Sequence, residues 1–121
     1  TFLARSAAES AFRLPIKAII ADTETGRIAR ILSTYRCHVP IFAFSPQLTT
    51  VRALSLSYGV VSALLPAADS TEQLVSRSLK ALMEHGRIES DDLVAVIGGT
   101  PGKSETTNFL EINTAASCLG I

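Results

Sequence analysis

Residues 18–27 set the class of this fold, and they read Ala18-Ile19-Ile20-Ala21-Asp22-Thr23-Glu24-Thr25-Gly26-Arg27. The apolar first half is typical of a buried strand, and the Thr/Gly turn that follows it opens a helix. The first N–H groups of a helix have no partner inside the helix, and the helix dipole places partial positive charge there. This turn is therefore predicted to be a seat for a phosphate or a carboxylate.

Outward from this turn, apolar runs of strand length alternate with stretches of helical spacing along the chain. Helices are predicted over four ranges: 2–13, 25–35, 48–56 and 69–86. Strands are predicted over five ranges: 16–21, 41–44, 60–65, 93–97 and 107–113. Pro46 is expected at the first position of the third helix, with Val51, Leu54 and Leu56 facing the core. The tail, residues 114–121, receives no assignment.

Alternation of helices with continuously apolar strands predicts a parallel sheet with helices on both faces. The fifth strand follows the fourth after only about ten residues and no helix, so it is predicted to be antiparallel and at an edge. The expected fold is a three-layer α/β/α domain with a five-stranded, mostly parallel sheet. It is one domain over residues 1–121, with a core at 2–113. Ligands of such sheets bind outside the carboxyl ends of the strands, where both Gly-rich turns fall.

The composition excludes several classes of partner. Eleven basic residues balance eleven acidic ones among 121 residues, so there is no electrostatic case for nucleic acid or an anionic membrane. The absence of Trp argues against base-stacking platforms, and no apolar run reaches the ~20 residues of a membrane span. Cys37 and Cys118 fit neither a disulfide framework nor a metal site and suggest reduced thiols in the cytoplasm. The start of the chain lacks a signal-peptide layout and an initiator Met, as expected of an excised or processed piece.

The turn after the first strand has two interpretations. In the first, Thr23 or Thr25 caps the helix through its hydroxyl, Gly26 lets the backbone approach a ligand, and Arg27 offers a charge to an anion. In the second, the turn is an ordinary helix start without a ligand. Glu24 favours the second interpretation, because its carboxylate repels an anion unless it points to solvent.

The second Gly-rich turn, residues 98–104, is similar to a Walker A loop but departs from it twice. Ile97 stands where that motif needs its first Gly, and the residues after the turn favour a strand rather than a helix. What remains is a loop that offers backbone N–H groups, Lys103, Ser104 and Thr106 to an anion.

Catalytic constellations are missing from the sequence. His38 and His85 are isolated, and no spacing suggests a nucleophile with its base. His38 is expected on the surface, whereas His85 can meet the dipole of a helix C-terminus or reach an anion. Asp91 and Asp92 are typical of a solvated turn, and a metal site there is disfavoured because no third ligand is near in sequence.

Three motifs carry a resemblance to a known family. They are the segment Thr23-x-Thr25-Gly26-Arg27, then Tyr35-Arg36 followed by Val39-Pro40-Ile41, and finally Gly99-x-Pro101 followed by Thr106-Thr107-Asn108. Over about residues 2 to 113 the chain resembles the C-terminal domain of pyruvate kinase. One departure lies inside the second motif, where Cys37 replaces the usual proline.

The resemblance implies a regulatory and assembly domain. The family's catalytic barrel, with its phosphoenolpyruvate, ADP and metal sites, is not in this chain, so Mg and K are expected only for the parent enzyme. The C-terminal domain holds an allosteric site for a sugar phosphate or a nucleotide in many members, and its helices and last strand contribute to a tetramer interface. The implied effector residues are Thr23, Thr25, Gly26, Arg27, Gly99, Lys103, Ser104 and Thr106.

Two departures keep a second function open. Ile28 stands where the better effector binders have Ser or Thr, and Glu24 stands where some regulated members carry Lys. An assembly domain without an effector is therefore the alternative. A stand-alone enzyme on a doubly wound fold is a third option, disfavoured because no nucleophile–base pair is present.

Overall fold

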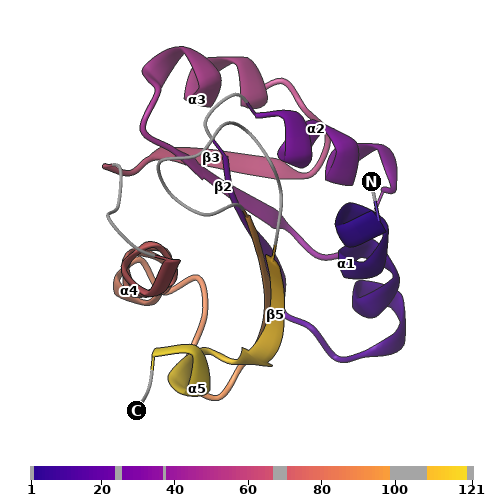
Figure 1. Cartoon of the computed structure of the whole chain (residues 1–121), viewed down its shortest axis with the longest axis vertical. Coiled ribbons are helices and arrows are strands. Elements are labelled where there is room, and N and C mark those ends of the chain that lie inside the picture. Colours follow the sequence, from indigo (N-terminus) through magenta and orange to yellow (C-terminus); the bar gives the residue numbers. More distant parts are fainter. Residues whose placement is uncertain (1, 24–25, 37, 67–70, 99–108, 120–121) are drawn as a thin grey trace.

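The computed structural model describes residues 2–23, 26–36, 38–66, 71–98 and 109–119. Helices and strands alternate as the sequence predicts, with one short helix added after the last strand (Figure 1). In chain order the elements are α1 (Phe2–Arg13), β1 (Ala18–Asp22), α2 (Arg27–Thr34), β2 (Ile41–Ser45), α3 (Leu48–Leu54), β3 (Val60–Leu64), α4 (Thr71–Glu84), β4 (Leu93–Gly98), β5 (Phe109–Thr114) and α5 (Ala115–Leu119).

The five strands form one sheet in the order β3-β2-β1-β4-β5. All neighbours are parallel except β4 and β5, which are antiparallel, so the predicted class of fold is confirmed. The chain builds outward from β1 through β2 to β3 and then returns to place β4 on the other side of β1. The strand order therefore reverses between β1 and β4, and in sheets of this kind ligands bind at that point.

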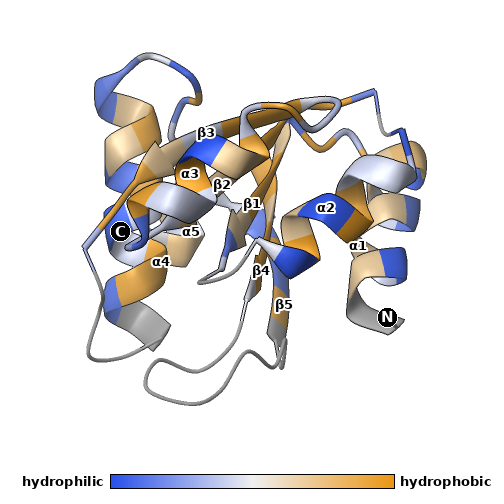
Figure 2. Cartoon of the chain, turned by 90° about the horizontal axis from the view of Figure 1, so that it is seen from above, coloured by the Kyte–Doolittle hydropathy of each residue, from blue (hydrophilic) through white to orange (hydrophobic). Residues whose placement is uncertain are grey.

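Helices cover both faces of the sheet. Figure 1 shows α4 and α5 on the side opposite to α1, and Figure 2 shows the apolar strands enclosed between the helices. All five residues of β1 are buried. Ile19 and Ala21 join the cluster with α1, α2 and α3, whereas Ala18 and Ile20 join the cluster with α4 and α5. A strand buried on both faces needs a continuous apolar run, which is the pattern that predicted it.

The structure corrects the predicted end of the third helix. α3 ends at Leu54, where the N–H of Ser57 donates to the Leu54 carbonyl and closes a turn. Leu54 is fully buried, but Leu56 lies beyond the helix and is 90% exposed, so its predicted core position was wrong. Pro46 is not in the first turn, because Gln47 after it is extended and precedes the helix.

Among the described helices the longest is α4, with 14 residues. None of them combines the length and apolar character that crossing a bilayer requires.

Candidate functional site

The carboxyl ends of β1 and β4 meet where the strand order reverses. Asp22, the last residue of β1, is the register partner of Gly98, the last residue of β4. The two Gly-rich turns of the sequence leave the sheet from these two adjacent positions. The first turn leads into α2, and most of the second lies in residues 99–108, outside the described residues.

Thr23 shapes the first turn. Its N–H donates to the Phe44 carbonyl at 2.9 Å, which extends the pairing with β2. Its Oγ1 accepts the N–H of Gly26 at 2.9 Å. The N-cap residue of α2 is Gly26, and no side-chain hydrogen bond caps the helix. The prediction that the Thr23 hydroxyl caps the helix was therefore wrong, and this hydroxyl closes the preceding turn instead. Thr25, the other predicted cap, lies outside the described residues.

Gly26 is required by space and by backbone conformation. Its φ of 86° lies in the left-handed region, and a Cβ built on it would lie 3.1 Å from Leu54 Cδ2 and 3.2 Å from Thr50 Cγ2. The close approach that glycine allows here is therefore to α3. This contact fixes the amino end of α2 against the neighbouring helix.

The amino end of α2 is electropositive. The N–H of Arg30 donates to the Gly26 carbonyl at 3.0 Å, and the N–H groups ahead of it have no acceptor inside the helix. No acidic residue lies in the first turn, and the exposed Arg27 occupies the first helical position. A cation at a helix N-terminus opposes the dipole, and a bound anion would offset both charges.

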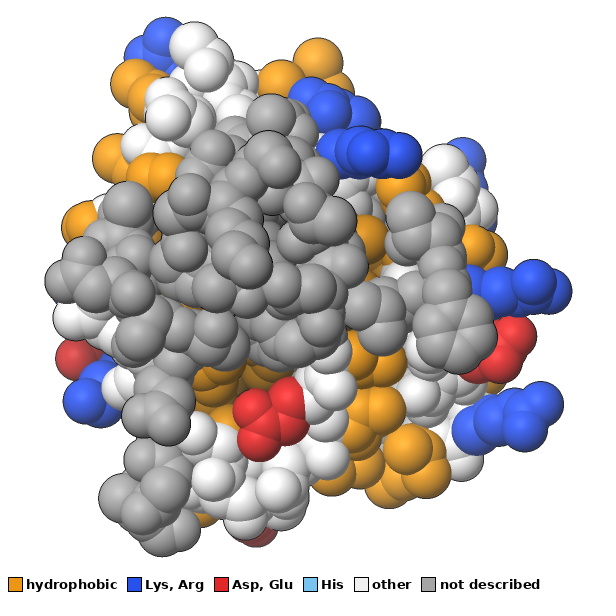
Figure 3. Space-filling model, in the orientation of Figure 1, with side chains coloured by type: hydrophobic (Ala, Val, Ile, Leu, Met, Phe, Trp, Pro, Cys, Tyr) orange, Lys and Arg blue, Asp and Glu red, His pale blue; other side chains and the backbone are white. Residues whose placement is uncertain are grey.

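Basic side chains also gather on the side of the molecule formed by α1 and α2. Figure 3 shows Lys and Arg side chains gathered over the side where α1 and α2 lie. Among the described residues of these two helices, the exposed arginines are Arg5, Arg13, Arg27 and Arg30. The acidic residue in the described part of these two helices is Glu9, which pairs with Arg5 at 3.5 Å.

Of the predicted effector residues, the structure places Thr23, Gly26 and Arg27 in one turn at the point where the strand order reverses. The remaining five lie outside the described residues: Thr25, Gly99, Lys103, Ser104 and Thr106.

Sequence reasoning missed Asp22, which is buried at the end of β1. Its Oδ1 lies 2.9 Å from Ser78 Oγ of α4, and no partner for its Oδ2 is found in the part of the chain that the structure describes. Burial raises the pKa of Asp22 to about 7, although the hydrogen bond from Ser78 lowers it. The signal in the sequence was an acid at the last position of an otherwise apolar strand.

His85 is excluded from the same site by the direction of α4. The helix starts after β3 and runs back to the amino edge of β4. Its 14 residues span about 20 Å, so His85 lies at the opposite end of the sheet from Gly26. Its Nδ1 lies 2.8 Å from the Ala81 carbonyl oxygen in the last turn of α4. His85 therefore lies at the carboxyl end of a helix, as predicted. His38 is exposed, as predicted, and its ring centroid lies 5.6 Å from that of Phe12.

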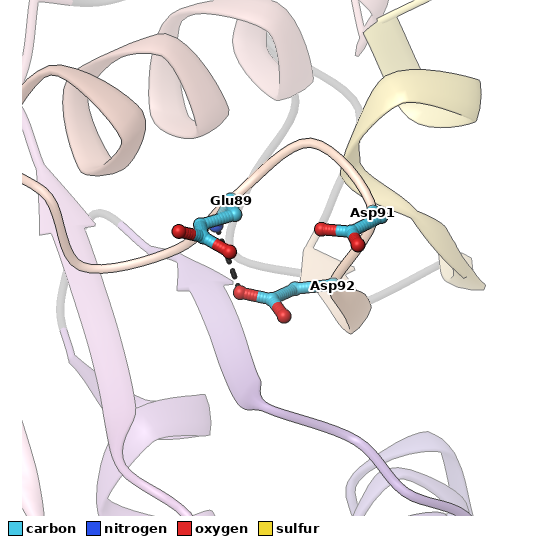
Figure 4. Close-up of side chains that lie close together, drawn as sticks. All are labelled: Glu89, Asp91 and Asp92. Atoms are coloured by element: carbon cyan, nitrogen blue, oxygen red, sulfur yellow. Dashed lines mark hydrogen bonds between the residues drawn. The ribbon is translucent and has the colours of Figure 1, made fainter.

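Three carboxylates gather ahead of β4. Figure 4 shows Glu89 beside Asp91 and Asp92, and one oxygen from each lies within 4.8 Å of the others. The N–H of Glu89 donates to Asp92 Oδ2 at 2.8 Å. A third carboxylate is therefore close, contrary to the prediction. The three carboxylates are largely exposed and precede the amino end of β4, at the end of the sheet opposite to the amino end of α2, so we assign no ion to them.

Cys118 of α5 is a free cysteine, as predicted, and Cys37 lies outside the described residues. Burial, together with the nearby Glu111 carboxylate, raises the pKa of the Cys118 thiol to about 11. The thiol is therefore held protonated and is a poor nucleophile at neutral pH.

Comparison with known proteins identifies relatives of the whole domain. The family model described as pyruvate kinase, alpha/beta domain, matches residues 2–113. The pyruvate kinases of Staphylococcus aureus strains USA300 and NCTC 8325 are each 37% identical over 109 residues, covering 89% of this chain and 19% of each relative. The chain thus spans about a fifth of the length of the curated relatives that it matches.

Solved structures give the same result. A crystal structure of a pyruvate kinase from Cryptosporidium parvum superimposes with a TM-score of 0.82 at 32% identity, over 94% of this chain and 22% of that one. The structure of Cryptosporidium parvum pyruvate kinase in complex with ADP gives 0.83 at 30% identity, over 94% and 23%. Because the family model matches residues 2–113 and the fold superimposes on these solved relatives, the chain belongs to the pyruvate kinase alpha/beta domain family.

Proposed function

We propose that this chain is the regulatory and assembly domain of a pyruvate kinase and binds a phosphorylated sugar or nucleotide at the amino end of α2. One observation carries the proposal. The amino end of α2 lies where the strand order reverses, with Arg27 exposed at the first position and no acid in the first turn. This arrangement favours a phosphate over a neutral or cationic ligand.

In this proposal the chemistry happens elsewhere. The parent enzyme transfers phosphate from phosphoenolpyruvate to ADP in the cytoplasm, and its barrel domain holds the Mg and K ions. The effector acts by favouring one arrangement of a homotetramer, since a ligand with equal affinity for both arrangements shifts nothing. Coupling of this kind is typically about 1–3 kcal/mol.

The residues have separate roles in the proposed site. Arg27 and the N–H groups at the amino end of α2, which have no acceptor inside the helix, attract the phosphate. Thr23 positions the turn, because its Oγ1 holds the N–H of Gly26. Thr25 contributes a hydroxyl to the same phosphate. The loop from Gly99 to Thr106 closes over the ligand and supplies Lys103 and Ser104.

The alternative, an assembly domain without an effector, is favoured by Ile28. This residue is only 3% exposed and packs in the core cluster with α1. It therefore serves packing at a position where effector-binding relatives present a hydroxyl. In this alternative the last strand, β5, pairs with its two-fold mate, because it is an edge of the sheet and, among the described strands, pairs with β4 alone.

Calorimetry on the full-length protein separates the two. We expect binding of at least one of four probes: fructose 1,6-bisphosphate, glucose 6-phosphate, ribose 5-phosphate and AMP. Arg27→Glu should weaken that binding by about tenfold or more, because it removes a cation and adds an anion at the helix end. Arg30→Glu is the matched control, since it makes the same charge change at an exposed position nearly one turn further along α2.

If none of the four probes binds at millimolar concentration, the effector site is refuted and the assembly function is the one that remains. Glu24→Lys adds one more test. A gain of sugar-phosphate affinity in this variant would identify an intact seat that the native carboxylate obstructs.

A further inference from the structure

Asp22 is a buried acid that the proposed effector site does not use. It is 8% exposed, and its register partners are Phe44 of β2 and Gly98 of β4. Its carboxyl group reaches Ser78 of α4, on the face of the sheet opposite to α2. An ionised carboxylate in such an apolar setting is costly unless its oxygens are paired.

The hydrogen bond from Ser78 compensates an ionised Asp22 only in part. Ser78 Oγ lies 2.9 Å from Asp22 Oδ1 and also 2.9 Å from the Leu74 carbonyl. The hydroxyl has one proton, so an ionised Asp22 and the carbonyl compete for it. An ionised Asp22 therefore has only a shared proton on Oδ1 to offset its burial, whereas a protonated Asp22 carries no charge to offset. The orphaned Oδ2 then belongs to a neutral group, for which the lack of a partner costs less.

No ionisable group in the described parts of the neighbouring elements offsets this burial. β2 and β4 present Phe44 and Gly98. The described charged residues of α4 are Arg77, which donates to the Pro66 carbonyl at 3.4 Å, and the exposed Lys80 and Glu84. The pKa of Asp22, about 7, is accounted for by burial and by Ser78.

We infer that Asp22 links effector binding to protons: the amino end of α2 accepts a phosphate when Asp22 carries its proton, and the affinity falls when Asp22 ionises. The inference rests on the proposed effector site. Asp22 immediately precedes Thr23, whose Oγ1 accepts the N–H of Gly26, so a single residue connects the acid to the hydrogen bond that closes the turn ahead of α2. Water screens the buried Asp22 carboxylate poorly, so its negative charge repels an anion bound nearby. By reciprocity, a bound phosphate raises the pKa of Asp22.

The test is calorimetry on the full-length protein with inorganic sulfate and with fructose 1,6-bisphosphate, at about pH 6 and about pH 8.5. Sulfate keeps its charge over this range, whereas phosphate monoesters titrate near pH 6. We expect about tenfold weaker sulfate binding at the higher pH, which matches a rise of about one unit in the Asp22 midpoint on binding. Asp22→Asn, which imitates the protonated acid, should bind sulfate with the same affinity at both pH values.

The matched control is Asp91→Asn, which removes the same charge from an exposed position ahead of the amino end of β4. It should keep the pH dependence of the native protein. A second readout needs no variant: sulfate binding near pH 7, compared in buffers of different ionisation enthalpy, should take up a fraction of a proton. Ser78→Ala should move the fall in sulfate affinity to higher pH. In the native protein the hydrogen bond from Ser78 lowers the pKa of Asp22, so removing this bond raises the pKa.

The outcomes separate this inference from the effector site. Binding with the same pH profile in the native protein and in Asp22→Asn overturns the inference and leaves the effector site standing, as does binding without proton uptake near pH 7. No binding of either probe at either pH overturns both.

Discussion

Gly26 occupies a conformation and a space that other residues fill only at a cost. Its positive φ strains any side chain, and a Cβ would press on Leu54 and Thr50. Gly59 provides a comparison, because its φ is 70° but nothing lies within 4 Å of its missing Cβ. The two glycines thus separate backbone strain from crowding.

Gly26→Ala should destabilise the chain by about 2–4 kcal/mol, and Gly59→Ala by about 1–2 kcal/mol, since only the first adds a clash to the strain. Urea unfolding of the two variants measures both values. Equal losses would show that α3 yields to the added methyl group.

Asp22 makes stability depend on pH. Its pKa rises from 3.8 to about 7 on folding, so the folded chain holds this proton more tightly than the unfolded chain does. The resulting stability is fully present below about pH 4 and is lost as the pH rises through about 7. At about 1.4 kcal/mol per unit the loss is of the order of 4 kcal/mol.

Asp22→Asn should therefore be more stable than the native chain at about pH 8 and similar to it at about pH 4, because the amide cannot ionise. Denaturant unfolding at both values gives the measurement, with Asp91→Asn as control. A native chain that gains stability between pH 4 and 8 relative to Asp22→Asn would contradict the prediction.

At the scale of elements, apolar runs and helical spacing predicted the type and order of every segment through β5. They did not predict where α3 ends, because backbone bonds such as Ser57 N–H to Leu54 O decide that. Nor did they reveal Ser78 beside Asp22, since the two are 56 residues apart. Periodicity predicts the face on which a side chain lies, and only the packed fold determines what it meets there.

The end of α3 supplies a matched pair of leucines. Leu54→Ala should cost about 2–5 kcal/mol of stability, because it empties a fully buried position. Leu56→Ala, two residues later, should change stability by less than about 0.5 kcal/mol, since that side chain is 90% exposed. Thermal or denaturant unfolding decides, and similar losses in both variants would place Leu56 in the core after all.

At the scale of the whole molecule, both edges of the sheet matter for assembly. β3 and β5 are the edge strands. The proposed assembly uses β5, where Asn113 is exposed, whereas β3 exposes Val61 on the other edge. The sequence predicted the antiparallel edge strand, but the order of the remaining strands came only from the structure.

Asn113→Lys should shift a β5-paired oligomer of the full-length protein toward smaller species, because a two-fold contact brings the two added charges together. Val61→Lys makes a comparable change on β3 and should leave the oligomer intact. Sedimentation velocity distinguishes them. Dissociation by Val61→Lys alone would move the interface to the opposite edge.

The antiparallel pairing of the last two strands has a consequence for how such domains diversify. Gly98 and Phe109 are cross-strand partners, so residues 99–108 begin and end at a fixed rung of the ladder. A connection whose two ends are held by paired strands can change in sequence at a small cost in loop-closure entropy. Under the proposed function, a change of effector among related domains therefore requires substitutions in residues 99–108 alone, and the strands that hold the two ends stay the same.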